Sequence, residues 1–592
     1  MQDPASFYAQ ELDKFKTLEK QLKGRSNRLS ITRIAVFLMT VALVYFFGNS
    51  PMVLILIILT GIALFLGLLS IHSEIRTKKS LVQRLLLMNL EELDIAKGNY
   101  LTRQNGEEYA IPHHEFSQDI DLFGRGSFFQ YMNRTGLKEG AGFLAQSIQS
   151  DDISAIRKKQ KAVSELSEDP AWLQRYTALA QELDNETPTA PLVHWIAQYK
   201  AFLKPVHRFL AHVFGIISLL LLALTVLQVI SISVIGYWIL LGLAFTSLFL
   251  KKVNKLSSRA SSAKVFFKQY ALLLKEIEER RFETELLLKL QKQIEMDGEK
   301  ASSIFRKFSK RLDALDHRNN LLVGVLGNGL FLWDLQQSFR IEQWIKSYGK
   351  KAEDWFQVAA AFDAYNSLGL FAFNHQEFCY PEIADRGSKE LIHAKHLGHP
   401  LIATDKRVCS DLEINSTNFF IITGANMAGK STFLRAVALH IVMANLGLPV
   451  CAKSSVYQPI KLISSMRTSD SLTDESSYFF SELTRLKYIV DALQNGRYFV
   501  ILDEILKGTN STDKAIGSRK FVERLVGLGA SGIIATHDLS LTETDQHLKE
   551  VTNYFFDAEI RNDELYFDYK LKRGICQNMN ASFLLRKMDI VS

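Results

Sequence analysis

Three short polar segments follow apolar runs in the last third of the chain, and their side chains could handle a phosphate group. The first is Gly-Ala-Asn-Met-Ala-Gly-Lys-Ser at residues 424–431, a full match to the pattern G-x-x-x-x-G-K-[ST]. It follows the apolar run 419–422 and precedes a helix-like stretch from Thr432 to Ala444. Strand, loop and helix in this order are the context that the pattern requires. The sequence therefore predicts a phosphate-binding loop, or P-loop.

Each residue type in this loop has its own task in holding a nucleotide. The glycines let backbone N–H groups wrap around a phosphate at the N-terminus of the following helix. Lys430 would reach the β- and γ-phosphates, and the Ser431 hydroxyl would ligate Mg²⁺. We therefore expect ATP and Mg²⁺ as cofactors. The residues expected to hold the nucleotide are Gly424, Ala425, Asn426, Met427, Ala428, Gly429, Lys430, Ser431 and Thr432.

Two further apolar runs end in residues suited to hydrolysis. The run 498–502 is followed by Asp503 and Glu504, a Walker B arrangement. Asp503 would hold Mg²⁺ through water together with Ser431, and Glu504 would orient or deprotonate the attacking water. The run 532–535 leads to His537, where a γ-phosphate sensor belongs in this architecture. The sequence thus predicts a Mg²⁺-dependent ATP hydrolase whose catalytic residues are Glu504, His537 and Lys430.

The elements that must position these residues change in character along the chain. From residue 396 to 592, short β-rich runs alternate with helices, which is typical of an α/β domain with a parallel sheet. Residues 73–117 are charged and helix-prone, and residues 118–395 are largely helical. Within the latter, residues 252–320 carry apolar side chains at helical spacing, which indicates a long arm. Its Lys and Arg residues fit either a nucleic-acid-binding arm or a solvated helix face.

Two apolar blocks precede and interrupt the helical region. The first covers residues 31–72, is uncharged from Ile34 to Ile71 and is split by a turn at 48–51; the second covers residues 209–250, with a turn near 228–233. A spanning helix needs about 20 apolar residues, so each block is long enough for a hairpin of two such helices. The sequence therefore predicts four transmembrane helices. A third apolar run, residues 321–333, is too short to cross and is predicted to be a buried core helix.

Basic residues on the flanks of the apolar blocks predict the orientation. The two inter-helix turns are uncharged, whereas every outer flank carries Lys or Arg. The positive-inside rule places residues 1–30, 73–207 and the chain after residue 250 in the cytoplasm. We therefore expect a multi-pass protein of the inner, cytoplasmic membrane. The flanking residues are Lys20, Lys23, Arg25, Arg28, Arg33, Arg76, Lys78, Lys79, Arg84, Arg208, Lys251, Lys252 and Lys255.

Composition excludes several classes. The chain has 592 residues, 47% hydrophobic and 22% charged, which is incompatible with a mostly disordered or collagen-like protein. Its 70 basic and 63 acidic residues give a net charge of +7. This small excess does not by itself indicate nucleic acid binding, because the membrane flanks can account for it. The four cysteines form no C-x-x-C pair, so neither a disulfide framework nor a cysteine zinc site is expected.

The phosphate-site segments resemble those of the MutS family, the DNA mismatch repair ATPases. Residues 423–435 are similar to the MutS Walker A, including the unusual Asn-Met pair, and residues 502–513 to its Walker B with the loop that follows. Residues 476–483 resemble the MutS segment whose serine reaches the nucleotide of a dimer partner, and Ser477 is the matching position. His537 matches the family's sensor histidine. The resemblance implies an ABC-type ATPase domain, a homodimer with composite sites, and DNA as a partner.

A fainter resemblance extends upstream. His399-Pro400 is similar to the start of the MutS ATPase domain, and residues 121–126 and 157–166 resemble the start of its core, or lever, domain. The predicted fold class is therefore α + α/β. It comprises two transmembrane hairpins, a MutS-like helical core/lever domain at 118–395 interrupted by the second hairpin at 209–250, and a C-terminal P-loop domain at 396–592.

The departures from MutS leave two main functions open. Residues 1–117 have no room for the family's mismatch-reading domain, and the second hairpin stands roughly where MutS inserts its DNA clamp. One reading is a membrane-anchored MutS-like ATPase that couples ATP to DNA binding. The alternative is an ABC-type transport or membrane-remodelling ATPase that does not act on DNA. Against transport, no Leu-Ser-Gly-Gly-Gln signature is present and the spans carry no charged side chain to line a polar path.

Overall fold

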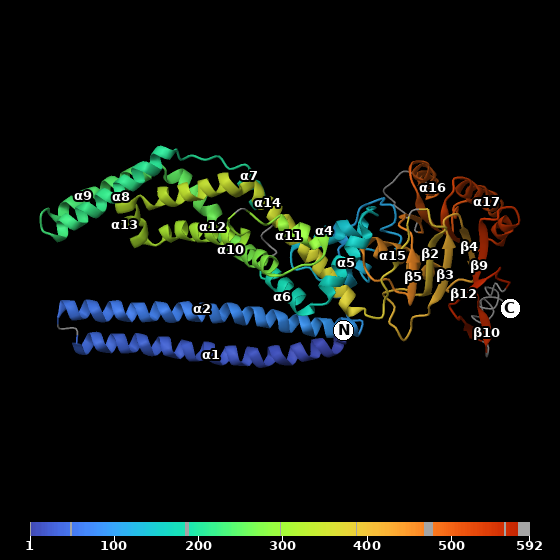
Figure 1. Cartoon of the computed structure of the whole chain (residues 1–592), viewed down its shortest axis with the longest axis horizontal. Coiled ribbons are helices and arrows are strands. Elements are labelled where there is room, and N and C mark those ends of the chain that lie inside the picture. Colours follow the sequence, from blue (N-terminus) through green and yellow to red (C-terminus); the bar gives the residue numbers. More distant parts are fainter. Residues whose placement is uncertain are drawn as a thin grey trace.

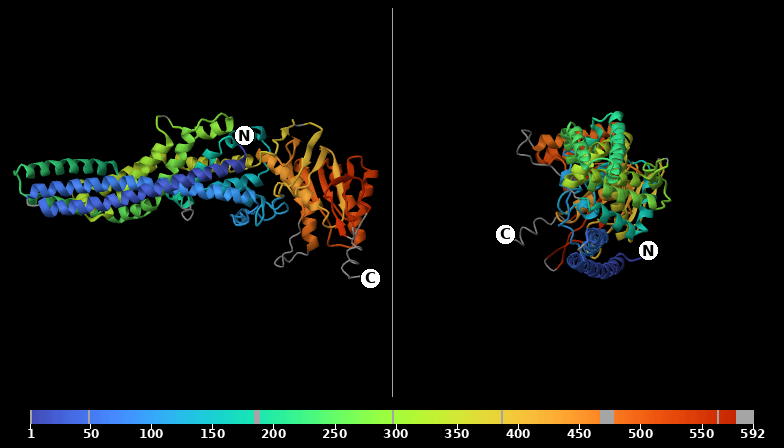
Figure 2. Two further views of the ribbon diagram at one scale, coloured as in Figure 1. Left: turned by 90° about the horizontal axis from the view of Figure 1, so that it is seen from below. Right: turned by 90° about the vertical axis from the view of Figure 1, so that its left-hand side faces the viewer.

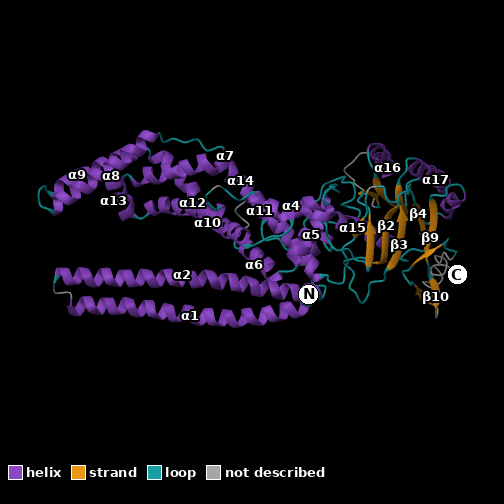
Figure 3. Ribbon diagram, viewed as in Figure 1, coloured by secondary structure: helices purple, strands orange, loops and turns teal. Residues whose placement is uncertain are grey.

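The computed structural model describes residues 2–47, 50–183, 189–296, 298–385, 387–466, 478–561 and 564–577. The molecule is elongated, with helices at one end and an α/β domain at the other (Figures 1 and 3). Both termini of the described chain lie away from the helical tips, which form the left end of Figure 1.

The N-terminal part is a long antiparallel hairpin of α1 (Pro4–Phe47) and α2 (Pro51–Ala96). Both helices continue without a break through residues 30 and 72, where the sequence analysis places its segment boundaries. The hairpin lies beside the helical body (Figure 2), and its apolar distal half is largely exposed. At its base, Phe7 and Tyr8 stack edge-to-face on Phe373 and fasten it to the body.

The helical body is built around a core of aromatic side chains. Phe267 makes edge-to-face contacts with Phe305, Phe308 and Trp344, and Phe308 stacks on Trp344 with centroids 3.7 Å apart. The body starts with α3 (Phe128–Met132), α4 (Lys138–Gln149), α5 (Ile156–Ser167), α6 (Pro170–Ala180) and α7 (Thr189–Ala197). It continues with α10 (Leu250–Glu279), α11 (Glu285–Lys292), α12 (Ala301–Asp316) and α14 (Trp333–Asn374).

A second apolar hairpin, α8 (Pro205–Val226) and α9 (Ile232–Ser247), projects from this body. By length and composition α1, α2 and α8 could each cross a membrane. A fourth candidate arises if α9 and the start of α10, bent by 74° at their junction, count as one span. The described residues therefore contain three such helices, or up to four.

The apolar run at 321–333 does form a helix, α13 (Leu321–Phe331), but the prediction that it is a buried core helix is wrong. Leu321 and Leu322 are 80% and 70% exposed, and of this helix only Asn328 and Gly329 are buried. The reason is its position outside the aromatic core, where it packs by one narrow edge against α9. Hydropathy alone cannot distinguish an apolar helix in a protein core from one on its surface.

The α/β domain contains a six-stranded sheet in the order β12-β9-β4-β8-β7-β6. Its neighbours β9-β4-β8-β7-β6 pair in parallel, and β12 (Leu571–Arg573) is antiparallel to β9. The central strands are buried along their length, which explains their uninterrupted apolar sequences. The parallel strands are β4 (Phe419–Gly424), β6 (Lys461–Ser465), β7 (Tyr498–Asp503), β8 (Ser531–Ala535) and β9 (Val551–Phe556).

Helices α15 (Lys430–Leu446), α16 (Tyr478–Asn495) and α17 (Ser511–Gly527) alternate with these strands. A second sheet, in the order β1-β5-β2-β3, joins the domain to the helical body. Its strands are β1 (Glu382–Ile383), β2 (Glu390–Leu397), β3 (Ser410–Asn415) and β5 (Ser454–Tyr457), and β10 (Glu559–Arg561) pairs with β11 (Glu564–Tyr566) in a separate ribbon.

Candidate functional site

The predicted phosphate-binding loop connects β4 to α15 and depends on two glycines. Gly424 has φ of +149°, and a Cβ at this position would lie 2.6 Å from the Phe556 carbonyl oxygen. Gly429 has φ of +103° and lies against the Tyr569 ring. Both backbone conformations are rarely adopted by residues with side chains. The loop shape therefore requires glycine at both ends, and α15 begins at Lys430 directly after it.

Gly424→Ala is expected to destabilise the domain and distort the loop. The added methyl group would meet backbone atoms of the neighbouring strand β9, which cannot move aside as a flexible side chain can. We expect a loss of about 1–3 kcal/mol, the usual cost of a strained backbone position. Thermal unfolding of the purified full chain measures it. The control is Gly527→Ala, where no atom lies within 4 Å of the added group and φ is not positive. Equal stability of the two variants would contradict the prediction.

The parallel register brings the three sequence-predicted segments to one edge of the sheet. Asp503 at the end of β7 is paired with Ala535 at the end of β8, and the Glu504 N–H donates to the Ala535 carbonyl at 2.9 Å. The carboxylate of Asp503 accepts a 2.5 Å hydrogen bond from the Ser431 hydroxyl. The two residues predicted to serve the metal are thus in direct contact. Burial raises the pKa of Asp503 above its ordinary value.

Lys430 lies at the centre of the site and is only 6% exposed. Its ammonium donates to the carbonyls of Gly424 and Ala425 at 2.9 and 3.0 Å, and it lies 3.2 Å from His537 Nε2. Burial lowers the Lys430 pKa, while the carboxylates of Glu504 and Asp503 oppose this effect.

Glu504 and His537, both predicted for the hydrolytic centre, are also in contact. His537 Nε2 lies 2.8 Å from Glu504 Oε1, and Lys507 Nζ lies 3.5 Å from the other carboxylate oxygen. The hydrogen bond from His537, followed by the charge of Lys507, lowers the pKa of Glu504 to about 2. The carboxylate is therefore ionised at neutral pH, as a group that accepts a proton or a hydrogen bond from water must be.

The chain after β7 is held in an unusual backbone conformation. Glu504 and Leu506 have φ of +50° and +59°, which is uncommon for residues with side chains. Glu482 from α16 fixes this turn, because its carboxylate accepts hydrogen bonds from the N–H groups of Leu506 at 2.6 Å and Lys507 at 3.1 Å. Glu482 lies in the segment 476–483 that resembles MutS, and the sequence alone does not indicate its contact with this turn.

A cavity of about 490 Å³ opens over the loop. Lys430, Ser431, Glu504 and His537 line it, and so do all the predicted loop residues except Gly424 and Ala428. Three apolar and aromatic residues that also line the cavity were not predicted from the sequence, because they come from segments distant in the chain. They are Ile402, Phe556 and Tyr569. Ser477, predicted to act in a dimer partner's site, lies outside the described residues.

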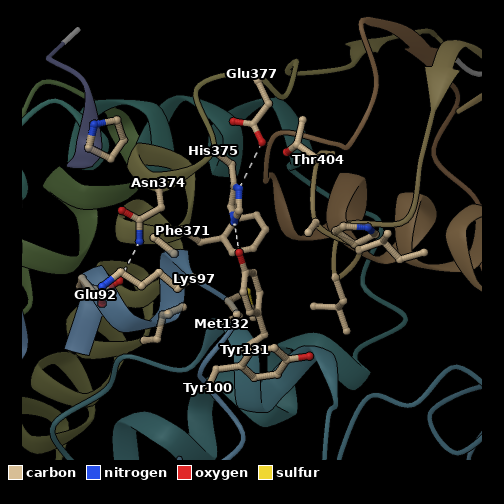
Figure 4. Close-up of a pocket in the computed structure, with 18 of the residues that line it drawn as sticks. Glu92, Lys97, Tyr100, Tyr131, Met132, Phe371, Asn374, His375, Glu377 and Thr404 are labelled. Carbon is tan, nitrogen blue, oxygen red and sulfur yellow. Dashed lines mark hydrogen bonds and ion pairs between the residues drawn. The ribbon is translucent and has the colours of Figure 1, made fainter. Parts of the chain in front are cut away.

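A second cavity, of about 660 Å³, lies where the N-terminal hairpin and α14 meet the α/β domain (Figure 4). Glu92 on α2 pairs with the buried Arg134, and its carboxylate also accepts a 3.0 Å bond from Asn374 at the end of α14. Asn374 in turn accepts a 2.6 Å bond from Tyr8 of α1. The segment 400–407 forms the opposite wall, and its Ile402 and Lys406 also line the cavity over the loop.

The α/β domain thus has a mostly parallel sheet and a glycine-shaped loop at a helix N-terminus, with a lysine and carboxylates at the same sheet edge. This arrangement is typical of domains that bind phosphate groups. Residues 420–585 match the family model described as MutS domain V. The C-terminal domain of this chain is thus similar to domain V of the MutS family.

Relatives with curated names agree with this assignment. The chain is 32% identical over 227 residues to human "MutS protein homolog 4", covering 36% of this chain and 24% of that protein. It is 30% identical over 224 residues to "DNA mismatch repair protein MutS" of Acetivibrio thermocellus, covering 37% of this chain and 26% of the relative. The MutS of Fusobacterium nucleatum is 34% identical over 189 residues, 31% of this chain and 20% of that protein. The chain thus spans about a quarter of the length of these relatives.

Proposed function

We propose that the protein is a membrane-anchored MutS-like ATPase that binds and hydrolyses ATP in a composite dimer and couples the ATP state to DNA binding. The observation that carries the proposal is the convergence of Lys430, Ser431, Glu504 and His537 on one cavity over a glycine-shaped loop, with Asp503 hydrogen-bonded to Ser431. The relatives' names supply the link to DNA mismatch repair.

The residues at the site fit ATP and Mg²⁺. The cavity of about 490 Å³ is within the usual size range of ligand sites, about 300–1,000 Å³. The Ser431 hydroxyl and the Asp503 carboxylate offer the oxygen ligands that Mg²⁺ prefers. Bound Mg²⁺ would neutralise charge on the phosphates. Lys430, buried beside the loop carbonyls, places a positive charge where phosphate oxygens would lie.

The remaining residues would serve the attacking water. Glu504 is ionised and can orient water or accept its proton. His537 contacts Glu504 on the same edge and lies 3.2 Å from the Lys430 ammonium, and it would serve as the sensor of the terminal phosphate. Ser477 of a second copy would complete the site in the dimer, as the resemblance implies. Met427, 80% exposed at the loop tip, is available for such a contact.

The proposed anchor consists of the two apolar hairpins, with the N-terminus and the α/β domain in the cytoplasm. Its support is the set of three helices, or up to four, that are long and apolar enough to cross a bilayer. Their distal side chains are exposed around most of the surface, as helices surrounded by lipid require.

The test is the rate of ATP hydrolysis by the full chain in nanodiscs, with and without duplex, mismatched or branched DNA, at two salt concentrations. We expect one DNA form to stimulate turnover and the effect to fall steeply with salt, because phosphate contacts release counterions. Lys430→Ala, measured in parallel, should abolish turnover with and without DNA. Turnover that is indifferent to every DNA would reject the DNA part of the proposal and favour transport or membrane remodelling.

A further inference from the structure

Helix α13 presents an apolar surface that no described part of the chain covers. The helix lies at the distal end of the helical body, next to the second hairpin (Figure 1). The exposed fractions are 80% for Leu321, 70% for Leu322, 46% for Leu326, 38% for Val325 and 37% for Val323. A surface of this kind on a single short helix is unusual in water and marks a site of contact.

The opposite edge of α13 is fitted closely to α9. A Cβ on Gly242 of α9 would lie 2.4 Å from the Gly329 carbonyl oxygen, and one on Gly329 would lie 2.6 Å from the Ile239 side chain. Such close backbone approach through small residues is typical of helices that pack within membranes. Gly329 of α13 and Gly242 of α9 therefore serve the attachment of α13 to the hairpin.

The hairpin also satisfies polar groups at the end of α13. The Ser218 hydroxyl of α8 donates to the Leu330 carbonyl at 2.5 Å and accepts a 2.8 Å bond from the Trp238 indole of α9. The Asn328 amide oxygen accepts the N–H of Asp334 at 2.9 Å. Polar groups at this end of the helix thus have partners inside the protein, which the apolar layer of a bilayer demands.

An ion pair joins the residues on either side of α13. Arg318, before the helix, lies 2.9 Å from the carboxylate of Asp334, after it, and also donates to Asn254 of α10 at 2.6 Å. A segment that leaves and rejoins the protein at a single ion pair does not cross a bilayer. With 11 helical residues it is also too short to do so.

We infer that α13 is a re-entrant membrane segment. It is seated on the second hairpin, and lipid acyl chains cover its Leu- and Val-rich face. Lipid is favoured as the occupant because this face continues the exposed apolar surfaces of α8 and α9, where Leu219 and Leu240 are 58% and 63% exposed. The Arg318–Asp334 pair then marks the level at which the protein emerges from the bilayer. The inference rests on the proposed membrane anchor.

The experiment uses the full chain, with its four native cysteines replaced, reconstituted in nanodiscs. An environment-sensitive fluorophore is attached at Leu322→Cys, and quenching by lipids with nitroxide-labelled acyl chains is compared with quenching by aqueous iodide. Leu326→Cys provides a second position on the same face. Leu240→Cys on α9 reports on the anchor itself, and Lys487→Cys, on the exposed face of α16, reports on water.

We expect lipid quenching at residue 322 to be within about twofold of that at residue 240, and iodide to quench only at residue 487. Lipid quenching at 240 with iodide quenching at 322 and 326 would overturn the inference and leave the anchor intact. Protection of 322 and 326 from both quenchers would also overturn it, because protein, such as a second copy, would then cover the face. Absence of lipid quenching at 240 would reject the anchor together with the inference.

Discussion

Replacing Glu504 by glutamine is expected to reduce steady ATP turnover by about 10²–10⁴-fold, the usual contribution of a positioned general base. Glutamine keeps the shape of the side chain and can still accept a hydrogen bond from His537, but it cannot accept a proton. Asp503, Ser431 and Lys430 remain in place, so ATP affinity should change by no more than a few-fold. Turnover and equilibrium ATP binding, measured on the same nanodisc preparation, test both parts.

The matched control for this variant is Glu523→Gln, an exposed position on α17 in the same domain. It should retain the parental turnover. Unchanged turnover in Glu504→Gln would mean that another group activates the water. Loss of ATP binding together with turnover would mean that Glu504 mainly supports the loop, through its positive φ and its contact with His537.

The second large effect is expected at the junction of the helices, where Arg134→Met should lower the free energy of unfolding by about 3–5 kcal/mol. That range is typical when one partner of a buried ion pair is removed. Arg134 is 7% exposed and Glu92 is 5% exposed, and the guanidinium also donates to the Tyr131 carbonyl at 2.6 Å. Methionine preserves apolar bulk but leaves the Glu92 carboxylate buried without its cation. Denaturant unfolding in detergent measures the difference.

An exposed pair gives the comparison. Lys487 and Asp491 on α16 lie 3.2 Å apart, with side chains 76% and 51% exposed. Lys487→Met should therefore cost less than about 1 kcal/mol. If the two variants lost similar stability, Arg134 would not hold the junction. A loss confined to Arg134→Met would locate the effect in the contact between the N-terminal hairpin and the rest of the molecule.

Local patterns were sufficient for the candidate site because each part lies within a few residues of a strand end. Glycine spacing, Lys430 and the Asp503–Glu504 pair could all be read from short windows, and parallel pairing then brings the strand ends together. The structure places these residues as that argument expects, and their roles in hydrolysis remain predictions. Tyr569 and Ile402 could not be found this way, since only tertiary packing brings them to the cavity.

Contacts between distant parts of the chain, and the exposure of individual helices, could not be predicted from the sequence. The hydrogen bond from Tyr8 to Asn374 joins residues 366 positions apart, and no periodicity in either segment indicates it. The prediction that α13 is a helix is confirmed, but the prediction that this helix is buried is wrong, because several of its side chains are exposed. An apolar composition shows that a helix can lie in an apolar environment. Whether other helices cover it depends on how the neighbouring segments pack.

In the proposed membrane-anchored protein, helix α14 would set the distance between the bilayer and the α/β domain. Its 42 residues give a contour length of about 63 Å at 1.5 Å per residue, and it runs without interruption from beside α13 to the junction with the α/β domain. With the distal end of α14 held at a bilayer, as proposed, the α/β domain would be confined to a layer of about this depth next to the membrane. Under the proposed function, any DNA bound by this domain would have to enter that layer, so the length of one helix would set the reach of the protein from the membrane.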